Sequence, residues 1–460
     1  MQLSSFHFIR SDIQLVSSLC PSSPIHHART ATKQTTRRRF LKATGLVAAP
    51  FILPSHVWAA KGDKAPNSRV NVAVIGPGKQ GRSHVHRLLR NPETQVVGFA
   101  EVAQVRTDHT KQLVEGHYAK NTPAGKWKGL TVTQDYRELL ALEQVDAVLI
   151  STPDHWHGEP TILSARAGKH IYCEKPISLT IAEGRRMVDA VKKNKVVFQT
   201  GSQQRTEYGG KFRRTVEMVR SGAIGKLKKI QVCVGPPPKP CDLPTEPIPE
   251  GTDWDAWLGP APERGYNKIL CPDNVHNHFP AWRRYREYCN GSLADMGAHH
   301  FDVGQWAMDA DNTGPVKVIP PKSGEKGLKL IYENGIEVEH GSLPDWRGGC
   351  VFYGDEGTIS VDRGPWKSDP ANLIKDYKAT VEIRQPRSHH ADWIACIRTG
   401  MQPLAHVEAG HRTASLCQLC NIGYELRREL AWDPKKETFK GDDEANKLID
   451  RKRRKKWYRI

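Results

Sequence analysis

Three glycines and one carboxylate have the spacing expected of a dinucleotide-binding turn. Gly76, Gly78 and Gly81 form a G-x-G-x-x-G pattern directly after an apolar run, and Glu101 follows twenty residues later. The first glycine permits a tight turn, the second lets the backbone approach a pyrophosphate, and the third lets a helix pack on a strand. A carboxylate at the position of Glu101 accepts hydrogen bonds from the adenosine ribose and repels a 2′-phosphate. The pattern predicts NAD, with NADP less favoured but kept open by the nearby Arg106.

Two loops further along the chain carry polar side chains. Thr152, Pro153 and His157 lie in the first loop, and Glu174 and Lys175 lie in the second. Each loop follows a short apolar run that is typical of a buried parallel strand. Ligands of open α/β sheets bind beyond the carboxyl ends of the strands. We therefore expect both loops to border the cofactor.

The elements that must position these residues alternate between strands and helices, which predicts an α/β fold. Buried strands are predicted at residues 70–75, 94–101, 147–150 and 170–173, and a helix at 82–90. A chain of 460 residues is too long for one typical core, so two domains are expected. The predicted segments are a leader (1–60), a dinucleotide-binding domain (68–200), a substrate and oligomerisation domain (201–445) and a basic tail (446–460).

Three sequence motifs follow one another along the chain, and their order is as informative as their residues. They are Thr-Pro-Asp-His-Trp-His at 152–157, Glu-Lys-Pro at 174–176, and Gly-Ser-Leu-Ala-Asp-Met-Gly-Ala-His-His-Phe-Asp at 291–302. Together they resemble the glucose–fructose oxidoreductase and inositol dehydrogenase (Gfo/Idh/MocA) family from about Arg69 to about Leu430. The resemblance implies an N-terminal Rossmann domain and a C-terminal α/β domain with a large, mostly antiparallel sheet. It also implies assembly into a homo-oligomer.

The resemblance implies roles for individual residues. Lys175 matches the family's catalytic lysine, and Asp295 and His299 match its Asp-x-x-x-His pair. Positions beside the nicotinamide and its ribose are implied for Thr152, Pro153, His157 and Glu174. Because histidine titrates near neutral pH, we expect His299 to be the acid/base and Lys175 to polarise the reacting oxygen. Asp295 would orient His299 or hold a neighbouring hydroxyl. The reverse assignment stays open, because burial and a nearby cation can lower the pKa of a lysine.

Other residues are candidates for substrate contacts. Arg205 and Tyr208 follow the strand that closes the first domain, and Asp302 ends the third motif. All three are able to hydrogen-bond a polyhydroxylated substrate, and a structural role is the alternative. No metal site is predicted, because the histidines do not complete a ligand set. Cys417 and Cys420 have helical spacing and are predicted to be small buried residues.

The predicted activity is NAD(P)-dependent oxidation of a secondary hydroxyl group of a sugar or glycoside. One alternative is a redox-neutral glycosidase or epimerase that keeps its NAD bound and acts through a 3-keto intermediate. An alternative of another class is a non-catalytic sugar- or nucleotide-binding module, since a fold does not determine function.

Both ends of the chain are strongly basic. Residues 36–42 read Thr-Arg-Arg-Arg-Phe-Leu-Lys, and this segment resembles a twin-arginine export signal. An uncharged stretch follows, with a cleavage site predicted near Ala60. We therefore expect export of the folded protein by the twin-arginine machinery, to the periplasm or beyond. The basic tail is expected to be solvated. One basic run without a recognised binding motif does not predict a nucleic-acid partner.

Overall fold

The structure is a computed structural model that describes residues 69–120, 129–342, 349–458 and 460. The predicted leader and its export signal, residues 36–42, lie outside these ranges. Within the described part of the chain, no helix has the length and apolar character that a membrane crossing requires.

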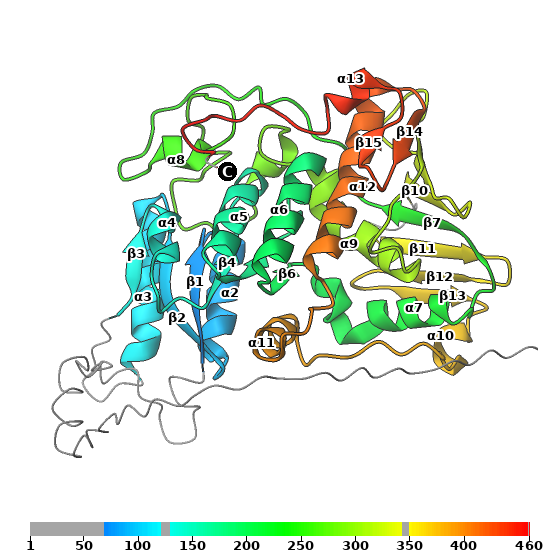
Figure 1. Cartoon of the computed structure of the whole chain (residues 1–460), viewed down its shortest axis with the longest axis horizontal. Coiled ribbons are helices and arrows are strands. Elements are labelled where there is room, and N and C mark those ends of the chain that lie inside the picture. Colours follow the sequence, from blue (N-terminus) through cyan, green and yellow to red (C-terminus); the bar gives the residue numbers. More distant parts are fainter. Residues whose placement is uncertain (1–68, 121–128, 343–348, 459) are drawn as a thin grey trace, which may run out of the picture. The chain divides into compact units, whose positions relative to one another are not determined.

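The first domain contains a six-stranded parallel sheet with the strand order β3-β2-β1-β4-β5-β6. Its strands are β1 (Val70–Ile75), β2 (Thr94–Ala100), β3 (Thr131–Thr133), β4 (Ala147–Ile150), β5 (His170–Cys173) and β6 (Phe198–Thr200). Its helices are α2 (Lys79–Arg90), α3 (Gln104–Ala119), α4 (Tyr136–Leu140), α5 (Gly158–Arg166) and α6 (Ile181–Asn194). The order reverses between β1 and β4, where a Rossmann domain binds its ligand. The predicted Rossmann fold is confirmed (Figure 1).

The apolar runs form strands here because helices cover both faces of the sheet. Every residue of β2 and β4 is buried, as expected for a parallel sheet between helical layers. On α2, Val85 and Leu88 face the sheet and join one cluster with Val72 of β1. Trp393 and Ile394 of the much later helix α11 (His389–Thr399) complete the same cluster.

The second domain is built on a nine-stranded sheet with the order β13-β12-β11-β7-β10-β9-β8-β14-β15. All pairings are antiparallel except that of β7 with β10, so the predicted mostly antiparallel sheet is confirmed. The strands are β7 (Leu227–Cys233), β8 (Lys317–Ile319), β9 (Leu328–Ile331), β10 (Glu337–Gly341), β11 (Gly349–Gly354), β12 (Thr358–Val361), β13 (Trp366–Asp369), β14 (Leu430–Asp433) and β15 (Thr438–Phe439).

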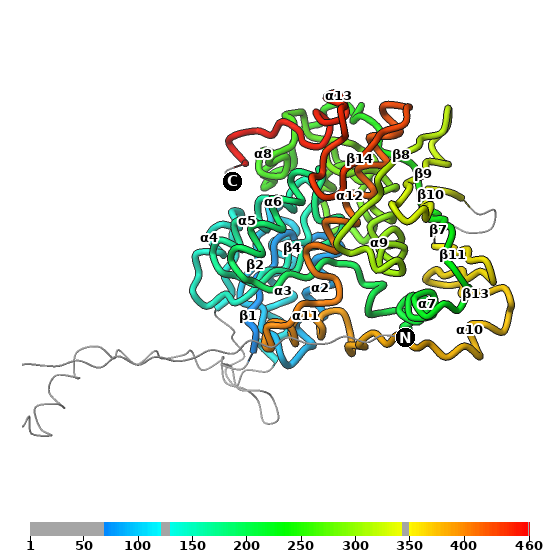
Figure 2. The backbone as a smooth tube through the Cα atoms, turned by 45° about the vertical axis from the view of Figure 1, so that its right-hand side comes forward, coloured from blue at the N-terminus to red at the C-terminus, as the bar shows by residue number. Residues whose placement is uncertain are grey.

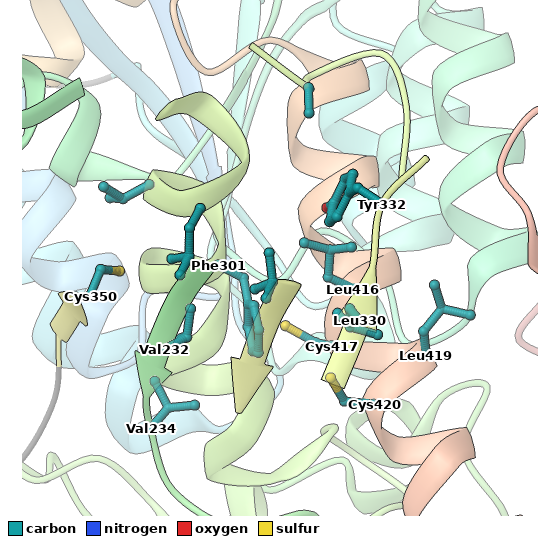
Figure 3. Packing of buried hydrophobic residues seen from close by; sticks show 14 of the residues in the cluster. Val232, Val234, Phe301, Leu330, Tyr332, Cys350, Leu416, Cys417, Leu419 and Cys420 are labelled. Carbon is teal, nitrogen blue, oxygen red and sulfur yellow. The ribbon is translucent and has the colours of Figure 1, made fainter. Parts of the chain in front are cut away.

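Three helices of this domain pack against the sheet, namely α7 (Lys211–Arg220), α9 (Gly291–Ala307) and α12 (Val407–Leu426). Their apolar side chains meet those of β7, β9 and β11 in one cluster, part of which Figure 3 shows. Cys417 and Cys420 lie in this cluster and are buried, as predicted. Short helices complete the domain: α8 (Trp254–Leu258), α10 (Leu373–Asp376), α13 (Asp443–Asn446), η4 (Gln203–Arg205), η5 (Tyr208–Gly210) and η6 (Ala281–Arg284).

The prediction that the basic tail is solvated is wrong for its arginines, although Lys452, Lys455 and Lys456 are exposed. Arg453 pairs with Glu183 of α6, and Arg454 pairs with Asp255 of α8. Trp457 joins the partly buried residues packed against the core of the first domain. Figures 1 and 2 both show this red segment running from α13 towards α8. Carboxylates on two separate helices compensate its positive charge, which the charge pattern of the segment alone does not reveal.

Candidate active site

A cavity of about 910 Å³ lies at the carboxyl ends of the first-domain strands and is completed by residues of the second domain. This volume is near the upper end of the roughly 300–1,000 Å³ typical of ligand and cofactor sites. Its lining includes the predicted cofactor-binding residues Gly76, Gly78, Glu101, Thr152, Pro153, His157 and Glu174. The predicted catalytic residues Lys175, Asp295 and His299 line it as well, together with Tyr208.

The glycine turn has the geometry that a pyrophosphate requires. Gly76 has a φ of +79°, and a Cβ atom on it would lie 2.9 Å from the backbone nitrogen of Thr152. At Gly81 a Cβ atom would lie 2.4 Å from the carbonyl oxygen of Gly76, so this glycine allows α2 to pack closely beneath the turn. A Cβ atom on Gly78 would have no neighbour within 4 Å. Gly78 precedes α2 and provides no side-chain cap for it. The free N–H groups there suit an anion.

Glu101 lies at the end of β2 and is held by a buried ion pair. Its Oε1 accepts hydrogen bonds from Arg106 Nη2 at 3.0 Å and from the Ala103 amide at 3.0 Å. Arg106 Nη1 donates to the carbonyl oxygen of Pro272 at 2.8 Å. Arg106, which keeps NADP open in the sequence, also contacts Cys271 Sγ at 3.4 Å, so three acceptors hold its guanidinium. Glu101 and Arg106 both line the cavity.

Glu101→Gln tests the predicted preference for NAD. The substitution removes the charge that repels a 2′-phosphate and weakens the hold on Arg106. We expect the ratio of the NADPH and NADH dissociation constants to fall about tenfold, measured by fluorescence titration. Asp108→Asn, on the exposed side of α3, is the matched control and should leave the ratio unchanged. An unchanged ratio in Glu101→Gln would show that Glu101 does not select the cofactor.

Lys175 and Asp295 form a close pair between the two domains. Lys175 follows β5, and its Nζ donates to Asp295 Oδ1 at 2.6 Å and to the Asp295 carbonyl oxygen at 2.9 Å. Burial alone would lower the pKa of Lys175, but the carboxylates of Asp295 and Glu174 raise it above its ordinary value. Lys175 is therefore an ammonium ion at neutral pH. The carboxylate that we expected to orient His299 instead receives the hydrogen bond of Lys175.

His299 lies one helical turn after Asp295 on α9, so both side chains share one face. Burial, followed by the positive charges of Lys175 and Arg363, lowers the pKa of His299 well below its ordinary value. Its Nδ1 has no hydrogen-bond partner among the described residues. A neutral imidazole at the cavity wall is suited to accept a proton.

Glu174 is the centre of a buried hydrogen-bond network that the sequence did not indicate. It accepts hydrogen bonds from His84 Nε2 at 2.8 Å and from Gln203 Nε2 at 3.0 Å. His84 Nδ1 in turn lies 2.9 Å from Nε2 of His390, at the start of α11. Burial would raise the pKa of Glu174, but its hydrogen bond with His84 helps to hold it at about 2. Glu174 is thus a fixed anion that can accept hydrogen bonds from the hydroxyl groups of a ribose.

His157 connects the two loops that border the cavity. Its Nδ1 lies 2.7 Å from the carbonyl oxygen of Pro176, and its Nε2 lies 3.0 Å from that of Thr152. Both ring nitrogens face acceptors. Burial opposes a positive charge on this ring, but Cys173, Asp154 and the Pro176 carbonyl together raise its pKa to about 10. His157 therefore holds the two loops together, and its contact with the nicotinamide stays a prediction.

Arg205 and Asp302 do not form part of the cavity wall, which corrects the expectation that they bind substrate. Arg205 is 1% exposed and donates to both oxygens of Asp302 at 2.8 Å. It also donates to both oxygens of Asp311, at 2.7 and 2.8 Å, and to the Leu404 carbonyl. All its donor nitrogens are therefore used within the protein. Tyr208 does line the cavity.

The proline-rich segment between β7 and α9 covers part of the cavity. Trp257 and Trp282 line it and are also members of a buried aromatic cluster. Arg283 also lines it, with its guanidinium 4.1 Å from the ring centroid of Trp282 and 5.0 Å from that of Phe279. Asp154 is a further lining residue that the sequence did not single out, and burial raises its pKa to about 6.

The Rossmann sheet has a glycine turn at its switch point, and a second domain closes the cavity and supplies an aspartate and a histidine. This arrangement is typical of a two-domain nucleotide-dependent oxidoreductase. Family models agree. The NAD-binding Rossmann fold of the Gfo/Idh/MocA oxidoreductase family matches residues 70–202, and the C-terminal alpha/beta domain of that family matches residues 239–459. This chain belongs to the Gfo/Idh/MocA family of oxidoreductases, and its first domain is an NAD-binding domain.

Several curated proteins are similar in sequence. Uncharacterized oxidoreductase YrbE of Bacillus subtilis is 27% identical over 64% of this chain and 74% of its own length. Myo-inositol 2-dehydrogenase of Thermotoga maritima is 30% identical over 38% of this chain and 48% of its own. Glycosyl hydrolase family 109 protein 1 of Shewanella sp. (strain ANA-3) is 29% identical over 42% and 44%. The alignments thus span less than half of the last two proteins.

Solved structures share the fold. The aldose-aldose oxidoreductase of Caulobacter crescentus, complexed with glycerol, aligns with a TM-score of 0.55 at 16% identity, over 79% of this chain and 99% of that one. The WlbA dehydrogenase of Bordetella pertussis, in complex with NADH and UDP-GlcNAcA, aligns with a TM-score of 0.54 at 16% identity over the same shares.

Proposed function

We propose that this chain is an NAD-dependent oxidoreductase that acts on a secondary hydroxyl group of a sugar or glycoside. The observation that carries the proposal is the presence of the Lys175–Asp295 pair, His299 and the Gly76–Gly78 turn in one cavity. The names of relatives that act on inositol or belong to a glycosyl hydrolase family support a polyhydroxylated substrate.

Different residues of the cavity would hold different parts of the cofactor. The glycine turn and the start of α2 would hold the pyrophosphate, Glu101 the adenosine ribose, and Glu174 the nicotinamide ribose. When bound, the nicotinamide supplies a hydride acceptor.

The chain's own residues handle the proton. Lys175 donates a hydrogen bond to the reacting hydroxyl oxygen and stabilises the negative charge that develops there, while Asp295 holds its ammonium group in place. His299, whose lowered pKa keeps the imidazole neutral, accepts the hydroxyl proton. The raised pKa of Lys175 and the lowered pKa of His299 favour this assignment over the reverse one.

The same pKa directions predict the pH dependence of the oxidation. His299 must be neutral to accept a proton, so kcat/KM should fall only when the pH drops below its pKa, which lies below 6.5. Lys175 must be protonated to donate, so activity should fall again above a pKa that lies above 10.5. A plateau between these limits is expected in a pH profile of kcat/KM. A rate that instead rises steadily up to about pH 10 would identify Lys175 as the base.

A direct experiment tests the proposed activity. The purified protein is denatured, and any released dinucleotide is identified by its mass; the native protein is then mixed with NAD and a panel of glycosides. We expect denaturation to release NAD, or the native protein to bind added NAD. We also expect NADH absorbance to appear with at least one glycoside. A protein that binds no dinucleotide would contradict the proposal.

A second candidate is the redox-neutral reaction through a 3-keto sugar, in which the same NAD is used again in every cycle. The glycosyl hydrolase family 109 relative favours it, as does the segment at residues 36–42, on which we propose export of the folded protein with its cofactor. Turnover of a glycoside without added NAD would support this reaction. Release of one NADH for every sugar oxidised would exclude it.

A further inference from the structure

The basic segment, residues 451–458, ends at the wall of the cofactor cavity. Trp457 is one of the lining residues, although the proposed chemistry assigns it no part. Figures 1 and 2 both place the end of this segment beside α8 and above α5. The segment thus reaches the cofactor site although Trp457 comes 376 residues after Gly81.

The basic segment is fastened at two points. Arg453 Nε lies 3.2 Å from Glu183 Oε1 on α6, where both side chains are almost fully buried. Further on, Asp255 of α8 pairs with Arg454 and accepts a hydrogen bond from Trp457 Nε1 at 3.0 Å. These contacts connect a helix of the first domain with α8. Since α8 itself contributes to the cavity wall, the segment also holds that part of the wall in place.

Trp457 lies at the adenosine end of the cavity. Its ring is 5.9 Å from that of Trp156 at 83°, and its ring centroid is 6.0 Å from the guanidinium of Arg137. Arg137 belongs to α4, which follows β3, the outer neighbour of β2. Glu101 at the end of β2 marks the position of the adenosine ribose in a Rossmann domain. The indole therefore borders the half of the cavity that receives adenosine.

We propose that Trp457 is a dinucleotide-binding residue and that the basic segment is a strap that holds it against the adenosine half of the cofactor. The inference rests on the proposed function, because it takes NAD as the ligand. An indole presents a large rigid apolar surface, and its N–H is already satisfied by Asp255, so it can cover an adenosine group at little cost in conformational entropy. The strap slows the dissociation of the cofactor.

Trp457→Ala in the full chain tests the strap. We expect the NADH dissociation constant and its dissociation rate each to rise about tenfold, which corresponds to about 1.4 kcal/mol. The first is measured by NADH fluorescence titration and the second by stopped-flow displacement with excess NAD. Lys455→Ala, which removes an exposed side chain from the same segment, is the matched control and should change neither value.

Two further variants separate binding from folding. Trp457→Phe keeps an aromatic ring and should retain most of the NADH affinity. Asp255→Asn loosens the anchor without changing Trp457 and should raise the NADH dissociation constant severalfold. Thermal unfolding without dinucleotide shows whether each variant is folded. An NADH dissociation constant within twofold of wild type in both folded Trp457→Ala and Asp255→Asn would overturn the strap and leave the proposed function intact. A wild-type protein that binds no NADH would overturn both.

Discussion

Replacing Lys175 with alanine should lower kcat for glycoside oxidation by about a thousandfold and leave the NADH dissociation constant within about twofold of wild type. The ammonium group of Lys175 is held 2.6 Å from Asp295 and is the cation placed to stabilise negative charge on the reacting oxygen. Asp295 does not lose every cationic neighbour in this variant, because Arg283 Nε lies 3.5 Å from it. The loss should therefore affect the chemical step more than the fold.

Steady-state kinetics and NADH titration measure this result. Lys193→Ala is the matched control, because Lys193 is an exposed lysine on α6. His299→Ala should show a similar loss of kcat, since it removes the proposed proton acceptor. If Lys175→Ala and His299→Ala both retained full turnover, the catalytic assignment would be wrong, although the dinucleotide site would stand.

Arg205→Met should reduce the free energy of unfolding by about 3–5 kcal/mol. Removing this guanidinium leaves the carboxylates of Asp302 and Asp311 without the cation that lies between them, and Asp302 is 1% exposed. Uncompensated buried charge is costly, because the protein interior solvates it poorly. Urea denaturation followed by circular dichroism measures the change.

The control for this variant is Arg166→Met on the exposed side of α5, which should change the free energy of unfolding by less than about 0.5 kcal/mol. Arg205→Met should also keep the KM of any properly folded fraction close to wild type, because Arg205 does not line the cavity. Wild-type stability together with a strongly raised KM would instead restore the substrate-binding role that the sequence suggested.

The dinucleotide turn could be predicted because its determinants are local. A buried strand, the glycines from Gly76 to Gly81 and the start of α2 are consecutive in the chain. Glu101 directly follows the next strand, and parallel strands bring their carboxyl ends to one edge of the sheet. Strand and helix periodicity are therefore sufficient to place these residues together, as the cavity lining shows.

The tertiary structure alone decided which long-range partner each charged side chain has. Lys175 and Asp295 are 120 residues apart, and Arg205 and Asp302 are 97 residues apart. The sequence motifs placed all four near a cleft, but only the packing of α9 turns Asp295 towards the cavity and Asp302 towards Arg205. The basic tail is a further example, because its arginines pair with Glu183 and Asp255, which lie far from it in the sequence.

The sequence by itself determined the chain's α/β order and its dinucleotide turn, because periodicity and turn chemistry depend on neighbouring residues. Whether a charge is solvated, buried in an ion pair or directed into the cavity depends on which other elements pack against it. Periodicity does not contain that information. Trp457 and Arg205 therefore acquired their roles only in the folded structure.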